Sequence, residues 1–143
     1  MRNNIVIAEN AGFCFGVKRA TDAVEKRISE KKNHERLFTL GHLIHNDGYN
    51  KWLEDNGVKS IEVADIENIC RTTDERNPTT VFIRAHGIPT STEELLKKCK
   101  NENAFFDYVD LTCPYVKKIH RIAKENSTEE LCRQHKIVYF CQH

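Results

Sequence analysis

Two cysteines lie far apart in the chain but in closely similar surroundings. Cys14 begins Cys-Phe-Gly-Val-Lys-Arg-Ala, and Cys113 begins Cys-Pro-Tyr-Val-Lys-Lys-Ile. Each follows a short apolar run typical of a strand and precedes a stretch with helical periodicity. A thiol at the start of a helix faces free N–H groups and the positive end of the helix dipole, which favour the thiolate. Because thiolates bind metals and clusters, these two cysteines are candidate metal ligands.

A single cysteine at a helix start is more often a structural residue than a ligand. The repetition of Val-Lys-(Arg/Lys) after both cysteines favours ligation. Gly12 and Gly16 flank Cys14 and would let the backbone approach a bulky inorganic group. We therefore expect Cys14 and Cys113 to form a site.

The remaining cysteines have weaker cases. Cys70 and Cys99 lie in helical stretches and are expected to be small core residues. Cys132 and Cys141 fall in the last dozen residues. Cys141 is a poor ligand candidate because no helix follows it.

Histidines follow two of the expected strands. His45 lies in Gly-His-Leu-Ile-His-Asn and His86 in Arg-Ala-His-Gly-Ile, and either imidazole could donate to a phosphate or relay protons. A single histidine in such a loop more often caps the loop, but two at one sheet edge favour a site. His42 and His120 are weaker candidates for such a site, because one lies in a loop and the other on a helix. His34 and His135 are expected at the surface.

Four cations occupy the first turns of the helices after the two cysteines, where the helix dipole disfavours positive charge. They are Lys18, Arg19, Lys117 and Lys118. Their placement predicts an anionic neighbour, either a negatively charged cluster or a phosphate.

Strands and helices alternate along the chain, which predicts an α/β fold with a mainly parallel sheet and helices on both faces. Strands are expected at residues 4–8, 36–40, 58–63, 80–84, 105–111 and 136–141, and helices after Cys14, at 47–55, after Pro89 and after Pro114. Ligands of such sheets gather at the carboxyl ends of the strands. Cys14, Cys113, His86 and either His42 or His45 are expected at that edge.

A domain boundary is expected where the first cysteine unit starts again. Residues 1–112 would form the first α/β domain, and residues 113–143 would begin a second, incomplete one. The last expected strand ends the chain with no covering helix, which would leave apolar surface and a free edge. We therefore expect the chain to be a fragment.

Composition excludes several classes. The chain has 143 residues, with 22 Lys plus Arg against 21 Asp plus Glu, so no global field favours nucleic acid or an anionic membrane as a partner. No apolar run approaches the ~20 residues that span a bilayer, and no signal peptide is evident. We expect a cytoplasmic protein, in which six cysteines indicate metal ligation, catalysis or burial rather than disulfides.

Four motifs together resemble one protein family. They are Ala-Gly-Phe-Cys-Phe-Gly-Val-Lys-Arg-Ala (11–20), Leu-Ile-His-Asn (43–46), Ile-Arg-Ala-His-Gly (83–87) and Asp-Leu-Thr-Cys-Pro-Tyr-Val-Lys-Lys-Ile-His (110–120). The family is the 4-hydroxy-3-methylbut-2-enyl diphosphate reductases of the non-mevalonate pathway of isoprene biosynthesis. The resemblance covers about residues 4–128 of a protein that is normally about twice as long.

This resemblance implies three α/β domains around a central 4Fe-4S cluster, with one cysteine from each domain. Cys14 and Cys113 match the first two ligands, and His45 and His86 match histidines that bind the substrate diphosphate. The implied reaction is an iron–sulfur reductive dehydroxylation of an allylic diphosphate to isopentenyl and dimethylallyl diphosphate. A ferredoxin or flavodoxin is the usual electron donor.

The sequence also departs from the family. His42 stands where a proline is usual, and the segment Leu131–His143 stops resembling the family. The third cysteine, a third histidine and the proton-relay glutamate are expected beyond this chain, so no catalytic residue is assigned within it and we expect it to be inactive alone. Two alternatives stay open. One is a cytosolic zinc or other metal-binding module, and the other is a thiol-based redox protein, although no Cys-x-x-Cys occurs.

Overall fold

A computed structural model of the chain describes residues 12–125, and the strands expected at 4–8 and 136–141 lie outside them. The four strands are β1 (Arg36–Leu40), β2 (Val58–Ile61), β3 (Thr79–Ile83) and β4 (Phe106–Asp110). The helices are α1 (Phe15–Ser29), α2 (Asp47–Asp55), the 3₁₀ turn η1 (Val63–Asp65), α3 (Ile66–Arg71), α4 (Thr90–Glu102) and α5 (Pro114–Glu125).

The four strands form one parallel sheet in the order β2-β1-β3-β4. Every residue of the central strand β3, with the sequence Thr-Thr-Val-Phe-Ile, is buried. A parallel strand covered on both faces carries such an apolar and β-branched run. The α/β fold with a parallel sheet that the sequence predicts is thus confirmed for the described residues.

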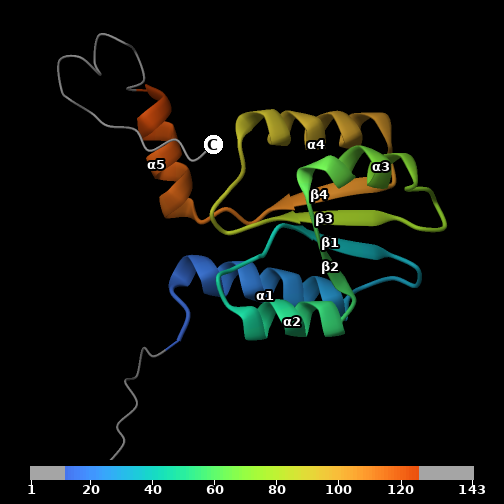
Figure 1. Ribbon diagram of the computed structural model, residues 1–143, viewed down its shortest axis with the longest axis horizontal. Helices are drawn as coiled ribbons and strands as arrows, with labels where there is room; N and C mark the ends of the chain where they lie inside the picture. Colours follow the sequence, from blue (N-terminus) through green and yellow to red (C-terminus); the bar gives the residue numbers. More distant parts are fainter. Residues whose placement is uncertain (1–11, 126–143) are drawn as a thin grey trace, which may run out of the picture.

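Helices cover both faces of the sheet, α1 and α2 on one side and α3 and α4 on the other (Figure 1). Alternate residues of β3 serve the two layers, because successive side chains of a strand point to opposite faces. Phe82 belongs to the core cluster on the α1 and α2 side, together with Ala20, Val24, Leu37, Leu53 and Val58. Val81 and Ile83 belong to the cluster on the α3 and α4 side, together with Leu40, Ile66, Ile69, Leu96 and Phe106.

Element bounds differ from the sequence expectations in small ways. The strand expected at 58–63 ends at Ile61, because Glu62 and Asp65 form a capping box that starts η1. The strand expected at 105–111 spans only Phe106–Asp110. The helix α4 begins at Thr90 directly after Pro89.

The helix α5 follows β4 and extends away from the sheet (Figure 1). It buries none of its residues within the described part of the chain, and Tyr115, Ile119 and Ile122 are exposed. The proposed boundary between residues 112 and 113 lies directly before this helix and stays a prediction. None of the helices between residues 12 and 125 combines the length and apolar character needed to cross a membrane.

Candidate functional site

The strand order creates a topological switch point at the carboxyl ends of β1 and β3. The chain leaves β1 toward α2 on one face of the sheet, and it leaves β3 toward α4 on the other face (Figure 1). Where neighbouring connections diverge in this way, ligands of parallel α/β sheets bind. His45 lies in the loop after β1, and His86 lies in the loop after β3.

The two histidines lie against each other at this switch point. Their ring centroids lie 4.6 Å apart at an interplanar angle of 47°. Burial lowers the pKa of His86, and the nearby His45 and Arg84 lower it further, because a second positive charge there would be repelled. The neutral form of His86 is therefore favoured, with one ring nitrogen able to donate and the other able to accept.

His42 takes no part in this pair. It is exposed and lines a small separate pocket with Asn50, Leu53 and Ser60. Of the two histidines that the sequence offered for this edge, His45 is the one beside His86.

The loop that carries His86 is tightly held. Arg84 Nε donates a hydrogen bond to the Gly87 carbonyl at 3.2 Å, and Gly87 has a positive φ of 81°. A Cβ atom at position 87 would lie 3.1 Å from both His120 Cε1 and Thr112 Cγ2. Gly87 thus gives the chain a left-handed turn and leaves room for a third imidazole.

His120 is the residue that sequence reasoning undervalued. It lies seven residues after Cys113, about two helical turns, so both residues are on the same side of α5. This spacing is the signal that could have placed His120 near the site.

The two cysteine units have the same local structure. Cys14 is the N-cap of α1, with an extended backbone, an exposed position and no side-chain capping bond. Cys113 directly precedes Pro114, the first residue of α5, and is half-buried. The carbonyl of each accepts a hydrogen bond from the lysine four residues on, at 2.8 Å for Lys18 and 2.9 Å for Lys117. The expected position of both cysteines at helix starts is confirmed.

The second cysteine unit packs against the first. A Cβ atom built on Gly16 would lie 2.4 Å from Cys113 Sγ and 3.0 Å from Cys113 Cβ. The Cys113 thiol therefore occupies the space that a side chain at position 16 would fill. Cys14 is two residues before Gly16, so the Cα atoms of these two residues lie at most about 7.6 Å apart. From the sequence, we expected Gly16 to let an inorganic group approach the backbone. In the structure, the absence of a side chain at Gly16 makes room for Cys113.

The same segment is tied to the histidine loop. The backbone N–H of Cys113 donates to the Ala85 carbonyl at 2.9 Å, one residue before His86. The half-buried thiol and the two imidazoles thus share the carboxyl edge of β3.

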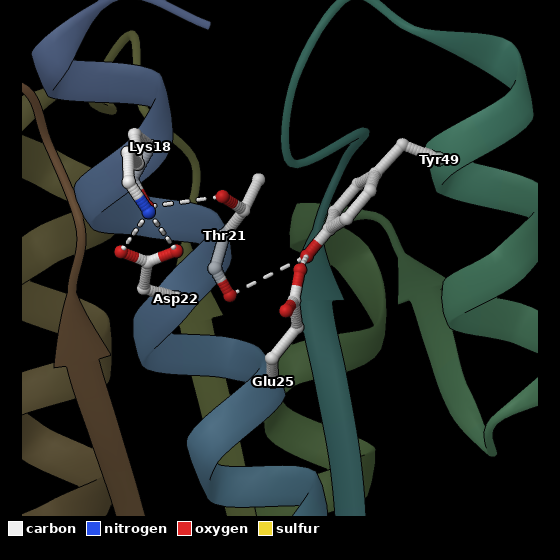
Figure 2. Close-up of polar contacts among 5 residues, drawn as sticks. All are labelled: Lys18, Thr21, Asp22, Glu25 and Tyr49. Carbon is white, nitrogen blue, oxygen red and sulfur yellow. Dashed lines mark hydrogen bonds and ion pairs between the residues drawn. The ribbon is translucent and has the colours of Figure 1, made fainter.

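Three of the four helix-start cations have partners within the chain. Lys18 pairs with Asp22 at 2.8 Å (Figure 2), and Lys117 pairs with Asp110 at 2.5 Å. Burial raises the pKa of Asp110, but hydrogen bonds from Lys117 and Thr112 outweigh it and lower the pKa overall. Arg19 Nη2 donates a hydrogen bond to the Thr112 carbonyl at 2.7 Å. For these three residues the expected anionic ligand is not needed to explain their positions.

Tyr49 fixes α2 against α1 close to Cys14. Its hydroxyl lies 3.1 Å from Glu25 Oε1 and 3.4 Å from the Thr21 carbonyl (Figure 2). Its ring stacks on Trp52, with 5.5 Å between the ring centroids. Burial, with the Glu25 carboxylate second, raises the pKa of Tyr49 above its ordinary value, so the hydroxyl remains a donor. The Phe13 ring packs edge-on against Tyr49 at 6.2 Å. The Phe13–Tyr49 contact joins segments that are distant in the chain, so no local sequence pattern predicted it.

The donor chemistry of the edge fits a soft metal centre in part. Thiols at two helix starts are the ligands that iron–sulfur clusters prefer. Within residues 12–125, no cluster of three or more His, Cys, Asp or Glu side chains is arranged to hold a metal ion. The described residues thus offer two thiols to such a centre.

The described residues thus form a parallel α/β protein with two helix-start thiols and a histidine pair at the switch point of its sheet. Comparison with known proteins identifies the family. The family model described as "LytB protein" matches residues 5–143, and the chain belongs to this family. The match includes the segment from Leu131 onward, so the expectation that the resemblance stops there was too narrow.

Curated relatives carry the name 4-hydroxy-3-methylbut-2-enyl diphosphate reductase. The protein from Caldanaerobacter subterraneus subsp. tengcongensis is 40% identical over 121 residues, covering 85% of this chain and 38% of the relative. The protein from Clostridium perfringens is 36% identical over 125 residues, covering 87% and 40%. The chain thus spans about two fifths of the length of these relatives.

Solved structures of the same enzyme share the fold. One structure of the reductase is 37% identical, with a TM-score of 0.61, covering 92% of this chain and 39% of that one. The Plasmodium falciparum enzyme is 31% identical, with a TM-score of 0.64, covering 82% and 34%.

Proposed function

We propose that this chain is the cluster-binding and diphosphate-binding part of a 4-hydroxy-3-methylbut-2-enyl diphosphate reductase. The names of the relatives support the activity of the whole protein. The observation that carries the assignment to this chain is the contact between Gly16 and the Cys113 thiol, which joins the two cysteine units.

Cys14 and Cys113 would hold two irons of a 4Fe-4S cluster, with a third thiolate from outside the described residues. Both lie at the positive end of a helix, which stabilises thiolate. When bound, the cluster would supply electrons and an iron without a cysteine ligand, as a catalytic rather than an electron-transfer cluster requires.

His45 and His86 would bind the diphosphate of the substrate. At 4.6 Å between ring centroids, the two imidazoles can both reach one phosphate group through N–H donors. A bound anion would also offset the repulsion from His45 and Arg84 that lowers the pKa of His86.

The overall reaction replaces the C–O bond of an allylic alcohol with a C–H bond. Two electrons and two protons enter, water leaves, and the diphosphate is retained in isopentenyl and dimethylallyl diphosphate. A ferredoxin or flavodoxin would deliver the electrons. We propose that the chain alone is inactive, because the residue that relays the proton is not assigned within it.

Binding of inorganic pyrophosphate, followed by the NMR signals of the histidine rings, tests the diphosphate role. We expect the rings of His45 and His86 to shift together, and His45→Gln or His86→Gln to weaken binding by about tenfold, the effect of one charge-assisted hydrogen bond. His42→Gln is the matched control, because it changes an exposed imidazole of the same loop. Equal weakening by the His42 variant would contradict the assignment.

Metal analysis of protein purified without oxygen tests the cluster role. Anaerobic reconstitution should give iron and sulfide in an unstable form, since the described residues supply two thiolates. Zinc without iron would favour the alternative of a zinc-binding module. A stable cluster that turns over substrate would contradict the proposed inactivity of the chain.

A further inference from the structure

The contact between α1 and Cys113 involves a second residue of α1, Arg19. Its Nη2 donates a hydrogen bond to the Thr112 carbonyl at 2.7 Å, directly before Cys113 in the chain. Arg19 follows Gly16 by three residues, so both lie on the same side of the helix. The helix thus touches this segment twice, at the peptide before Cys113 and at the thiol itself.

The environment of Arg19 shows what the side chain does. Its Nε is buried and has no hydrogen-bond partner among residues 12–125. Burying such a donor costs free energy. The bond to the Thr112 carbonyl is short and charge-assisted, which makes it one of the stronger hydrogen bonds in a protein.

We propose that Arg19 is a positioning residue, which with Gly16 clamps Thr112 and Cys113 to the start of α1 and so fixes the Cys113 thiol relative to Cys14. The Cys113 N–H is held by Ala85, its preceding carbonyl by Arg19, and its thiol lies against Gly16. These three contacts leave the Cys113 side chain little freedom to move away from α1. The inference rests on the proposed function only in taking the two thiols as ligands of one centre.

Cd²⁺ is a suitable probe, because it binds thiolates and its sulfur charge-transfer absorbance reports ligation without activity or a reconstituted cluster. Titrations would compare the chain with Cys113→Ser, Arg19→Met and Lys26→Met. Lys26→Met is the matched control, since Lys26 is an exposed cation of the same helix with a long 3.8 Å contact to Glu30.

We expect Cys113→Ser to remove the Cd²⁺–sulfur absorbance that requires both Cys14 and Cys113. Arg19→Met should weaken Cd²⁺ binding by about tenfold, the effect of losing one charge-assisted hydrogen bond, and Lys26→Met should leave binding unchanged. Wild-type affinity in Arg19→Met, with binding lost in Cys113→Ser, would overturn the clamp and leave the thiol site intact. Unchanged binding in Cys113→Ser would instead contradict the proposed site itself.

Conservative variants separate positioning from a general loss of stability. Lysine at position 19 can still donate to the Thr112 carbonyl, whereas glutamine is too short to reach it. We expect Arg19→Lys to bind Cd²⁺ more tightly than Arg19→Gln, even where Arg19→Met does not fold. Equal affinities for the lysine and glutamine variants would overturn the proposal.

Discussion

Cysteine side chains have opposite surroundings in two regions of the molecule. Cys14 and Cys113 lie at helix starts, one exposed and one half-buried. Cys70 and Cys99 lie between α3 and α4, 9% and 3% exposed, within an apolar cluster. The first pair has access to ligands and helix dipoles, whereas the second has neither. The contrast lies in position rather than residue type: two thiols stand at helix starts near the surface, and two are buried between helices.

The buried pair behaves as a structural contact. The Cys70 thiol donates a weak hydrogen bond to the Cys99 carbonyl at 3.8 Å. Burial first, and the neighbouring Cys70 second, raise the pKa of Cys99 to about 12. A protonated thiol is a poor nucleophile and a poor metal ligand. The sequence expectation that both are core residues is confirmed.

The largest expected difference between the two regions follows from glycine substitutions at equivalent helix positions. Gly16 and Gly48 are each the second residue of a helix, but a Cβ at 16 meets Cys113 Sγ at 2.4 Å and a Cβ at 48 meets only Asn46 Oδ1 at 3.4 Å. We expect Gly16→Ala to destabilise the chain by about 1–3 kcal/mol through overpacking. Gly48→Ala should be neutral or stabilise by up to about 1 kcal/mol.

Urea unfolding of the two glycine variants measures this difference. Equal effects of the two substitutions would show that the Cys113 thiol does not occupy the space beside Gly16.

Serine substitutions sharpen the contrast between the thiols themselves. In Cys99→Ser a buried hydroxyl replaces a thiol, and we expect a loss of about 1–3 kcal/mol. In Cys14→Ser a hydroxyl at an N-cap can accept from the first turn, so stability should stay the same or rise by about 0.5–1 kcal/mol. Thermal unfolding of both variants gives the comparison, and a larger loss at position 14 would contradict it.

A smaller effect is expected in the pH dependence of stability. The Cys99 thiol keeps its proton up to about pH 12 in the folded chain, whereas the unfolded thiol loses it near the ordinary value of 9.0. The unfolded state therefore binds fewer protons between these values, so stability falls as the pH rises above 9. Between pH 8 and pH 10 this one group should remove roughly 1 kcal/mol.

Cys99→Ala tests this assignment by removing the titrating group. The variant should lose less stability than the wild type over the same pH range, measured by denaturant unfolding at each pH. Parallel curves for the two proteins would show that Cys99 is not the source.

Much of this arrangement could be predicted from the sequence, because local patterns determine it. Apolar runs marked the strands, Pro114 marked the start of α5, and the helix expected at 47–55 is α2 (Asp47–Asp55). Placing Cys14 and Cys113 at helix starts needed only the order of strand, cysteine and helix.

Other features depend on contacts between distant segments and left no local pattern. Strand order alone placed either His42 or His45 at this edge, because the direction of the loop after β1 decides between them, and only the family resemblance singled out His45. The sequence could not show that Gly16 makes room for Cys113, or that Arg19 reaches the Thr112 carbonyl. Nor could it show that Asp22 and Asp110 pair with Lys18 and Lys117, so the anionic neighbour expected for these cations stays a prediction.

The closeness of the two cysteine units is best tested with a short bifunctional thiol reagent. The folded chain would be treated, digested and analysed by mass spectrometry for linked peptides. The account predicts an intramolecular link between Cys14 and Cys113 as the main product, with Cys70 and Cys99 unmodified until the chain is unfolded. Single modification of Cys14 and Cys113 without a link between them would contradict it.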